Sequence, residues 1–180
     1  HKKKTEVCGH VIEEVLEGND DYVEYLCHSK FFTDRKFKIR DYALDKAGLS
    51  PIQLERHQKI VHNGEMSETA LPSYTYIIKS HFQTSEDGNH YYVITEYMEE
   101  HSLRSAMQRN TFTDKDKVMI LLDIASALSL AHQNNVIHRN VCPENIYLQS
   151  DLHAALANFG LSYNIMHEDD KWGMTVSADA

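Results

Sequence analysis

The chain has 180 residues, of which 42% are apolar and 25% are charged, and its formal net charge is −9 at pH 7. This composition is typical of one soluble globular domain that is large enough to bury a hydrophobic core. The negative charge argues against non-specific nucleic-acid binding, which needs a basic face. Since no apolar run approaches the roughly 18 residues that a membrane span needs, we expect neither nucleic acid nor a membrane as a partner.

The thiols and imidazoles show no metal-binding pattern. The three cysteines, Cys8, Cys27 and Cys142, form no C-x-x-C pair, and the twelve histidines are scattered without the H-E-x-x-H spacing of zinc sites. We therefore expect no metal site. The small, odd number of cysteines favours reduced thiols in a cytoplasmic protein.

The first half of the chain predicts β-strands. Five segments are rich in β-branched and aromatic residues or alternate between polar and apolar ones; they are residues 11–16, 22–27, 36–42, 74–82 and 91–97. Turn-forming residues at 17–21 and 85–89 join neighbouring segments, so a hairpin is expected at each place.

Helices are predicted between and after these strands. Ser50-Pro51 offers an N-cap followed by a proline in the first turn, and residues 52–61 have a helical pattern. Asn63-Gly64 interrupts that pattern, so a second helical piece is expected from Glu65 towards Leu71, and residues 102–109 predict another short helix.

The clearest helix begins at an N-cap on Thr113 and runs to about Gln133. Apolar residues recur along it every three or four positions, which predicts one apolar face: Val118, Leu121, Leu122, Ala125, Leu128 and Ala131. Asn134-Asn135 ends the helix, because asparagine tolerates the left-handed conformation of a C-cap.

Two motifs follow this helix. The first reads His138-Arg139-Asn140-Val141-Cys142-Pro143-Glu144-Asn145, and the second reads Asn158-Phe159-Gly160. They resemble the catalytic loop, H-R-D-L-K-P-E-N, and the metal-binding motif, D-F-G, of eukaryotic-like protein kinases. The order of the predicted elements is similar to that of a kinase, so the resemblance covers nearly the whole chain. The extended segment before the first helix resembles kinase-like domains of large bacterial multidomain proteins.

The resemblance implies an α+β fold. A five-stranded antiparallel small lobe with one helix would be followed by the first, mainly helical part of a large lobe. Residues 1–98 then form the small lobe and hinge, and residues 99–180 form a partial large lobe that ends in the activation segment. Helices that normally cover the helix at 113–133 would be missing, so we expect an uncovered apolar face and self-association. The alternative is that the catalytic-loop hairpin and residues 166–172 cover that face.

Three positions that carry the chemistry of the family hold other residues here. The resemblance places Asn140 at the catalytic aspartate, Cys142 at the catalytic-loop lysine and Asn158 at the magnesium-binding aspartate. An asparagine has no carboxylate to act as a base, and its neutral amide is a poor magnesium ligand. Asn145 matches the residue that holds a second metal, but one neutral ligand will not retain magnesium. The resemblance therefore implies a pseudokinase without a metal.

The residues that shape the loops match the family. His138 and Phe159 correspond to two members of the hydrophobic column that stiffens an active kinase, and Arg139, Pro143 and Gly160 correspond to residues that shape the two motifs. The groups that pack are thus present, whereas the groups that carry charge to a nucleotide are absent.

The same resemblance locates a nucleotide pocket. Thr95 matches the gatekeeper, Glu96 to Met98 match the hinge backbone that binds adenine, and Tyr147 lies at the position beneath the adenine ring. Residues 17–22 stand where the family has a glycine-rich cover. They contain one glycine and three carboxylates, which would hinder a close backbone approach and repel a triphosphate, so an acidic turn is the favoured interpretation.

The basic residue of the third strand has two candidates. Aligning residues 37–40 with V-A-I-K puts Arg40 at the lysine position and Lys38 above adenine, whereas a shift by two makes Lys38 the phosphate-binding residue. We prefer Arg40, because the apolar residues on either side of Lys38 then face the core. Glu65 is the expected partner of Arg40, and Glu68 is the alternative.

These assignments predict a catalytically inactive kinase-like domain that acts as a protein-interaction or allosteric module. Its expected partners are other proteins or other domains of the same polypeptide. Weak ATP binding without magnesium is the most cofactor binding that we expect. The alternatives are residual or atypical phosphoryl or nucleotidyl transfer, and a sensor that binds ATP without turnover.

Overall fold

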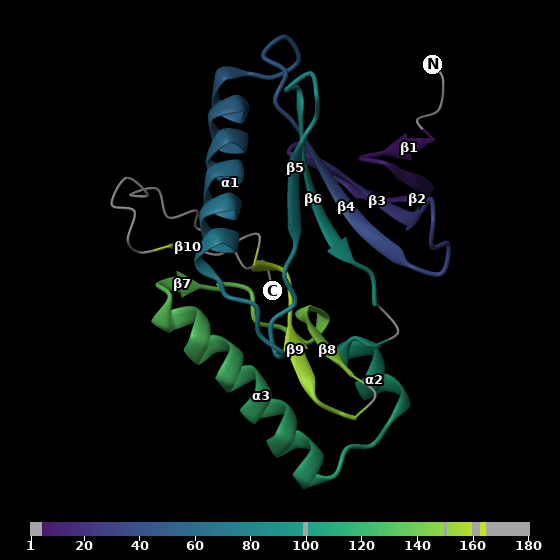
Figure 1. The fold of residues 1–180 in the computed structure, drawn as a ribbon, viewed down its shortest axis with the longest axis vertical. Coiled ribbons are helices and arrows are strands. Elements are labelled where there is room, and N and C mark those ends of the chain that lie inside the picture. The colour runs from purple at the N-terminus through teal and green to yellow at the C-terminus, as the bar shows by residue number, and fades with distance from the viewer. Residues whose placement is uncertain (1–4, 99–100, 150, 160–162, 165–180) are drawn as a thin grey trace.

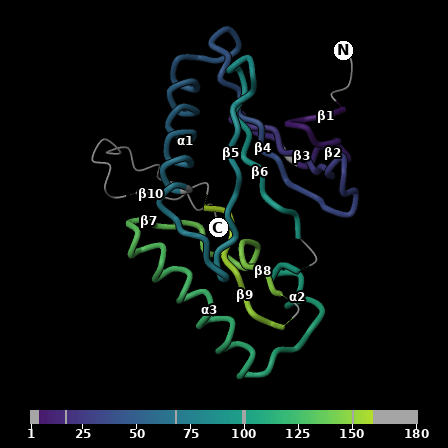
Figure 2. Tube along the Cα trace, in the orientation of Figure 1, coloured from purple at the N-terminus to yellow at the C-terminus, as the bar shows by residue number. Residues whose placement is uncertain are grey.

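The fold has an upper part, made of a curved antiparallel sheet and one long helix, and a lower part with two helices and short β-ladders (Figure 1). The structure is a computed structural model that describes residues 5–98, 101–149, 151–159 and 163–164. The Cα trace in Figure 2 shows the same arrangement of the two parts. This is the α+β arrangement of a kinase-like small lobe with part of a large lobe, as predicted.

Six strands form the sheet in the order β1-β2-β3-β4-β6-β5, and each is antiparallel to its neighbours. They are β1 (Glu6–Val7), β2 (His10–Gly18), β3 (Tyr22–Ser29), β4 (Lys36–Ala43), β5 (His81–Thr84) and β6 (His90–Glu96). The short β1 was not predicted. It joins β2 through Cys8-Gly9, two residues with positive φ that form a tight turn.

The strand expected at 74–82 forms only at its end, because β5 begins at His81. The residues before it bond to the lower part of the fold instead: the N–H of Ile78 donates to the carbonyl of Leu156 (2.9 Å), and the N–H of Leu156 donates to the carbonyl of Tyr76 (2.8 Å). The apolar residues of this segment therefore connect the two parts of the fold rather than extend the sheet.

Alternation along the strands gives the sheet two faces. On one face, Ile39 and Cys27 are fully buried in a cluster that includes residues of β1 and β6. On the other face, Tyr42 and Tyr91 pack with Ile60 of helix α1 (Pro51–Ala70). The helix thus covers one face of the sheet, on the side of β5 (Figure 1).

Helix α1 is continuous, so the interruption predicted at Asn63-Gly64 is wrong. Ser50 and Gln53 form a capping box that fixes its start. A glycine inside a helix costs about 1 kcal/mol relative to alanine. Gly64 is accommodated because a Cβ there would lie 2.8 Å from the ring of Phe82, so its lack of a side chain lets the helix approach β5 closely.

The lower part follows β6. Its elements are α2 (Leu103–Arg109), α3 (Asp114–Gln133), β7 (Val136–Ile137), a 3-10 helix (Pro143–Asn145), β8 (Ile146–Leu148), β9 (Ala154–Leu156) and β10 (Tyr163–Asn164). Helix α3 begins at a capping box formed by Thr113 and Asp116, and the left-handed residue after it is Asn135. Both ends lie where the sequence predicted them. In the described part of the chain, no helix combines the length and apolarity that crossing a membrane requires.

The apolar period of α3 was predicted correctly, but the buried row differs from the predicted one. The side chains that enter the core are Ile120, Asp123, Ile124, Ala127 and Ala131. In contrast, Val118, Leu121 and Leu122 are 54%, 68% and 61% exposed. Within the described residues this face of α3 is therefore open, as expected. Residues 166–172, the alternative cover, lie outside the described part.

Candidate functional site

The two motifs lie side by side in the lower part. The N–H of Ala157, just before the second motif, donates to the carbonyl of Asn145 (2.8 Å), and Nε2 of His138 donates to the carbonyl of Ala157 (2.7 Å). Both backbone polar groups of Ala157, its N–H and its carbonyl, are thereby bonded to residues of the first motif.

His138 is almost completely buried and is neutral in this arrangement. The N–H of Asn140 donates to its Nδ1 (3.1 Å), so the proton must sit on Nε2, which faces the carbonyl of Ala157. Burial lowers the pKa of His138 and outweighs the opposing effect of the Ala157 carbonyl. The ring of Phe159 contacts the imidazole edge to face, with 4.5 Å between centroids. The two residues that the resemblance assigns to the hydrophobic column are thus in contact.

Three asparagines of the motifs are joined by a chain of hydrogen bonds. Nδ2 of Asn158 donates to Oδ1 of Asn145 (2.7 Å), and Nδ2 of Asn145 donates to the carbonyl of Asn140 (2.9 Å). Asn158 has a φ of 62°, a left-handed conformation that asparagine tolerates better than most residues. These bonds determine the orientation of the side-chain amides of Asn145 and Asn158, that is, which terminal atom is oxygen and which is nitrogen.

The donor set at these positions does not fit magnesium. That ion takes hard oxygen ligands, usually with at least one carboxylate, whereas Asn145 and Asn158 present neutral amides that bond to each other. Among the residues that the structure describes, no group of three or more His, Cys, Asp or Glu side chains could hold a metal ion.

The other degenerate positions are also uncharged. The side chain of Asn140 is exposed. Cys142 is half-buried, and burial raises the pKa of its thiol above the ordinary value, so the thiol is protonated at neutral pH.

The residues expected to shape the two motifs are placed as follows. Pro143 begins the 3-10 helix, and Arg139 adopts a positive φ of 68°. Gly160 lies outside the described residues.

A partly buried ion pair lies on the face of the sheet that α1 covers. Strand pairing puts Glu24 of β3 opposite Arg40 of β4, and Nε of Arg40 is 2.7 Å from a carboxylate oxygen of Glu24. The guanidinium also lies over the ring of Tyr22, 4.7 Å from its centroid. Burial alone would lower the pKa of Arg40, but Tyr42 and Glu24 outweigh it and raise this pKa, so the side chain stays charged.

The expected pairing of Arg40 with Glu65 is therefore wrong. Glu65 is exposed on α1, and the side chain of Glu68 lies outside the described part. The buried residues of α1 are His57, Ile60, Gly64 and Ser67, and none of them carries a carboxylate. Arg40 takes the nearest carboxylate, which belongs to the neighbouring strand.

Lys38 lies on the same face as Arg40, and strand pairing places it opposite Thr95. Its ammonium lies 5.3 Å from the centroid of the Tyr97 ring. Ile39 points to the opposite face and is fully buried there. A shift by two residues keeps each side chain on its face, so this alternation fits Arg40 and Lys38 equally well in the lysine position.

The residues of the expected hinge and pocket floor lie between the two parts of the fold. The hydroxyl of Thr95 bonds to that of Ser80 (2.8 Å), and both are buried. Glu96 is exposed and lies 3.6 Å from Arg35, and Met98 is half-buried. Tyr147 is buried on β8, and a β-bridge joins its backbone to Ser102.

One feature was missed by sequence reasoning: the acidic turn between β2 and β3 is tied to α1. The carboxylate of Asp21 accepts hydrogen bonds from Arg56 and from Nε2 of His57 (3.1 Å). His57 is 1% exposed, and its Nδ1 lies 2.6 Å from the carbonyl of Ala43. No spacing in the sequence links Asp21 to these residues, so no local signal could have revealed the contact.

A model of the family described as protein tyrosine and serine/threonine kinase matches residues 52–178. The chain belongs to the protein kinase family. This kinase domain is 26% identical over 122 residues to the serine/threonine-protein kinase PLK4 of Drosophila willistoni and 26% identical over 180 residues to the human ribosomal protein S6 kinase alpha-2. It is also 26% identical over 125 residues to the membrane-associated tyrosine- and threonine-specific cdc2-inhibitory kinase wee-1.3 of Caenorhabditis elegans.

These alignments cover 66%, 94% and 69% of the kinase domain, respectively. The chain spans only 14%, 24% and 18% of the length of the three relatives, so the activities of the whole relatives do not transfer to it directly.

Between the lobes of the kinase domain, behind Thr95, lies a small cavity. It is lined by Gly64, Ser67, Leu71, Lys79, Ser80, Phe82 and Phe159. The hydroxyl of Ser67 is buried there without a hydrogen-bond partner in the described part of the chain. Nζ of Lys79 donates to the carbonyl of Leu71 (2.7 Å) and so satisfies the backbone just after α1.

Proposed function

We propose that this chain is a catalytically inactive kinase-like domain, a pseudokinase, that acts as a protein-interaction or allosteric regulatory module within a larger protein. The observation that carries the proposal is the hydrogen bond between Asn158 and Asn145. Phosphoryl transfer depends on metal ions that neutralise the developing charge. Here both candidate ligands are neutral and satisfy each other.

The remaining positions of the catalytic loop support the same proposal. Asn140 has no basicity to accept a proton from a substrate hydroxyl, and loss of a general base costs about 10² to 10⁴ in rate. Cys142 carries a neutral thiol where the family has a cation that approaches the transferred phosphoryl group. These losses affect different parts of the chemistry, so each lowers the rate further.

Nucleotide binding is proposed to be weak and independent of magnesium. Arg40, the candidate for holding phosphates, is already bonded to Glu24 and covered by Tyr22. The turn that would have to cover a nucleotide carries Asp20 and Asp21, and Asp21 is held by α1. A triphosphate would have to displace Glu24 from Arg40. It would also have to approach the negative charges of Asp20 and Asp21, which repel it.

Without catalysis, such a domain acts through its surface and shape, which bind other molecules. The backbone hydrogen bonds of Tyr76 and Ile78 with Leu156 join the two parts of the fold without a ligand, and His138 packs against Phe159 within the lower part. We propose other proteins, or other domains of the same polypeptide, as its partners.

The decisive experiment measures ATP binding by calorimetry and thermal shift, with magnesium and with a chelator. We expect little or no binding and no difference between the two conditions. Micromolar affinity that disappears with the chelator would overturn the proposal. Phosphorylation is followed in parallel with labelled ATP, and Asn140→Ala is the matched control: label incorporated by the natural chain and lost in the variant would make Asn140 chemically active.

A second candidate is residual or atypical transfer of a phosphoryl or nucleotidyl group. It is favoured because the loops of the two motifs are already fixed by contacts: Phe159 packs on His138, and Asn158 is hydrogen-bonded to Asn145. ATP labelled at the α-phosphate and at the γ-phosphate separates the possibilities. Incorporation of the α-label indicates nucleotidyl transfer, incorporation of the γ-label alone indicates phosphoryl transfer, and neither is expected for a pseudokinase.

A further inference from the structure

His57 is a fully buried histidine that has a hydrogen-bond acceptor at each ring nitrogen. Its Nδ1 lies 2.6 Å from the carbonyl of Ala43 on β4, and its Nε2 lies 3.1 Å from a carboxylate oxygen of Asp21 in the turn between β2 and β3. A carbonyl and a carboxylate only accept, so each bond needs a proton on the ring nitrogen that faces it. Both bonds exist together only when the imidazole carries two protons and a positive charge.

A neutral imidazole makes only one of these two bonds. Its single proton stays on Nδ1, because a lone pair there would face the carbonyl of Ala43 at only 2.6 Å. A lone pair on Nε2 then points at the carboxylate of Asp21. The guanidinium of Arg56 contacts the same carboxylate oxygen and stabilises its negative charge. Loss of the second proton therefore replaces an attraction between His57 and Asp21 by a repulsion.

The turn forms without help from α1. The side-chain oxygen of Asn19 accepts hydrogen bonds from the N–H groups of Asp21 (2.8 Å) and Tyr22 (3.0 Å), and the N–H of Asn19 donates to the carbonyl of Tyr22 (3.0 Å). These bonds give the turn its shape from its own residues. The contacts of the Asp21 side chain with α1 add only the attachment of the turn to the helix.

The charged and titratable groups that face His57 come from three elements. The turn contributes Asp21, α1 contributes Arg56, and β4 contributes Tyr42, whose ring contacts the imidazole edge to face with 5.9 Å between centroids. Behind them lie Tyr22 of β3 and the Arg40–Glu24 pair. Burial raises the pKa of Tyr42, so its hydroxyl is neutral at neutral pH. Asp21 favours a second proton on His57, whereas Arg56 opposes it, so the surroundings of the ring do not impose one charge at every pH.

We propose that protonation of His57 is a pH-sensitive switch that attaches the turn between β2 and β3 to α1. At the acid end of the range in which histidines titrate, about pH 5–8, the ring carries both protons, and His57 and Arg56 hold Asp21 together. At the alkaline end Asp21 keeps only Arg56, whose Nε is buried without a hydrogen-bond partner in the described part of the chain. The proposal does not depend on the proposed function, because none of these residues belongs to the two motifs.

NMR spectroscopy of the 180-residue chain labelled with nitrogen-15 tests the proposal. Ring nitrogen shifts report the protons on His57, and the backbone amide shifts of Asp21 and Tyr22 report the state of the turn. We expect the ring to lose its Nε2 proton as the pH rises through this range, and both amide signals to move with the same midpoint. Circular dichroism at each pH checks that the chain stays folded.

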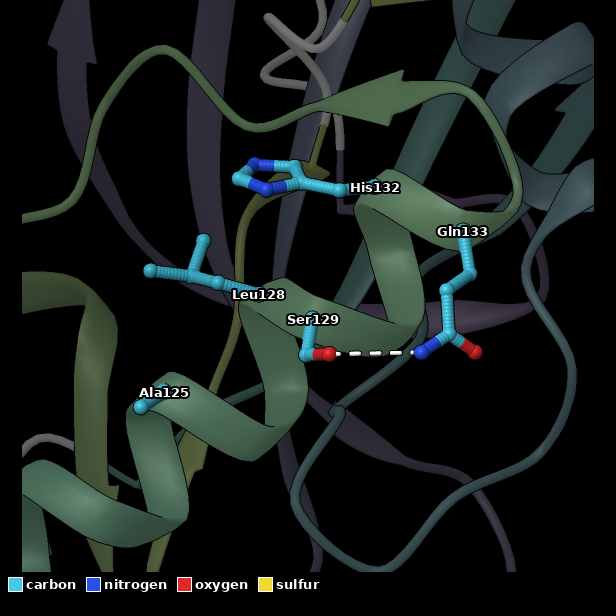
Figure 3. A pocket seen from close by; sticks show the side chains of 5 residues that line it. All are labelled: Ala125, Leu128, Ser129, His132 and Gln133. Carbon is cyan, nitrogen blue, oxygen red and sulfur yellow. Dashed lines mark hydrogen bonds between the residues drawn. The ribbon is translucent and has the colours of Figure 1, made fainter.

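Two variants separate the switch from other effects of pH. His57→Asn keeps an amide N–H near the position of Nδ1 for the bond to Ala43, but it has no group that faces Asp21. Asp21→Asn keeps an oxygen for Arg56 and no longer rewards a positive charge on the ring. In both variants the turn amides should lose their response to pH. His132→Asn is the matched control and should respond like the natural chain, because His132 is exposed and projects from α3 in the lower part of the fold (Figure 3).

Three results would overturn the proposal. The first is a natural chain whose turn amides do not follow the protonation of His57. The second is a neutral ring that keeps its proton on Nε2, since Nε2 would then donate to Asp21 at every pH. The third is a pH response of the turn that survives unchanged in His57→Asn or Asp21→Asn, since it would belong to another group.

Discussion

The side-chain amide of Asn158 donates a 2.7 Å hydrogen bond to the amide oxygen of Asn145. Asn145 cannot turn its amide over without breaking its own bond to the carbonyl of Asn140. The orientation of one amide thus determines the other. An aspartate at either position would place oxygen against oxygen or remove a donor.

Asn158→Asp should destabilise the folded chain. The carboxylate cannot donate to Asn145 and would face its oxygen at short range, so we expect a loss of about 1–3 kcal/mol in the free energy of unfolding. Urea denaturation measures this. Asn140→Asp is the matched control, because its side chain is exposed and such changes are usually within about 0.5 kcal/mol. Equal effects of the two variants would contradict the role given to the amide pair.

Arg40→Met should be costly by itself and much less so together with Glu24→Leu. The single change leaves the carboxylate of Glu24, which is 7% exposed, without its partner. Removal of one member of a buried pair costs about 3–5 kcal/mol, and the 37% exposure of the Arg40 side chain reduces the expected loss. In the double variant no charge is left buried, so urea denaturation should show recovery of most of the stability. A double variant as unstable as the sum of the single variants would argue against coupling.

His138 should titrate below the ordinary histidine pKa of about 6.5. Burial disfavours its charged form in the folded chain, so the unfolded chain takes up the proton first as the pH falls. The stability that His138 contributes is therefore complete above that ordinary value and is lost as the pH falls towards the lowered pKa of the folded state. Nitrogen-15 NMR over a pH titration should show His138 protonated at Nε2 in the folded chain, with a pKa below that measured for the chain unfolded in urea. A folded chain with the proton on Nδ1 would contradict the prediction.

Two buried serines on either side of the small interlobe cavity should respond differently to alanine. Ser67 has a buried hydroxyl without a partner in the described part of the chain, so Ser67→Ala should be neutral or stabilise by up to about 1 kcal/mol, helped by the helix propensity of alanine. Ser80→Ala removes the partner of Thr95 and should cost about 1–3 kcal/mol. Thermal or urea unfolding of the two variants side by side measures the contrast, which would be absent if Ser67 had an equivalent partner.

The features that the sequence predicted well are those set by local signals. The hairpin strands, the cap at Thr113 and the left-handed residue after α3 depend on residues close together in the chain. The packing of His138 against Phe159 followed from motif resemblance, which carries spatial information that periodicity lacks. The prediction of a break at Asn63-Gly64 failed because the fit of Gly64 against Phe82 is a tertiary contact.

The contacts of charged residues were harder to predict. Arg40 was expected to reach α1, but its partner Glu24 is a cross-strand neighbour, and register between strands is not visible in single residues. The contact of Asp21 with Arg56 and His57 joins a turn to a helix more than thirty residues away. Which carboxylate a cation finds depends on how the helix sits on the sheet, and that position is set by the packing of Tyr42, Tyr91 and their neighbours.

The bond network around Asp21 gives the small lobe a mechanical linkage. Because Asp21 holds both Arg56 and His57, and His57 also contacts the backbone of β4 at Ala43, a partner that tilts or shifts α1 also pulls on the turn and on the end of that strand. Movement of the helix would therefore be transmitted to the turn between β2 and β3 and to the end of β4. A fluorescent probe placed on the turn would report on events at α1.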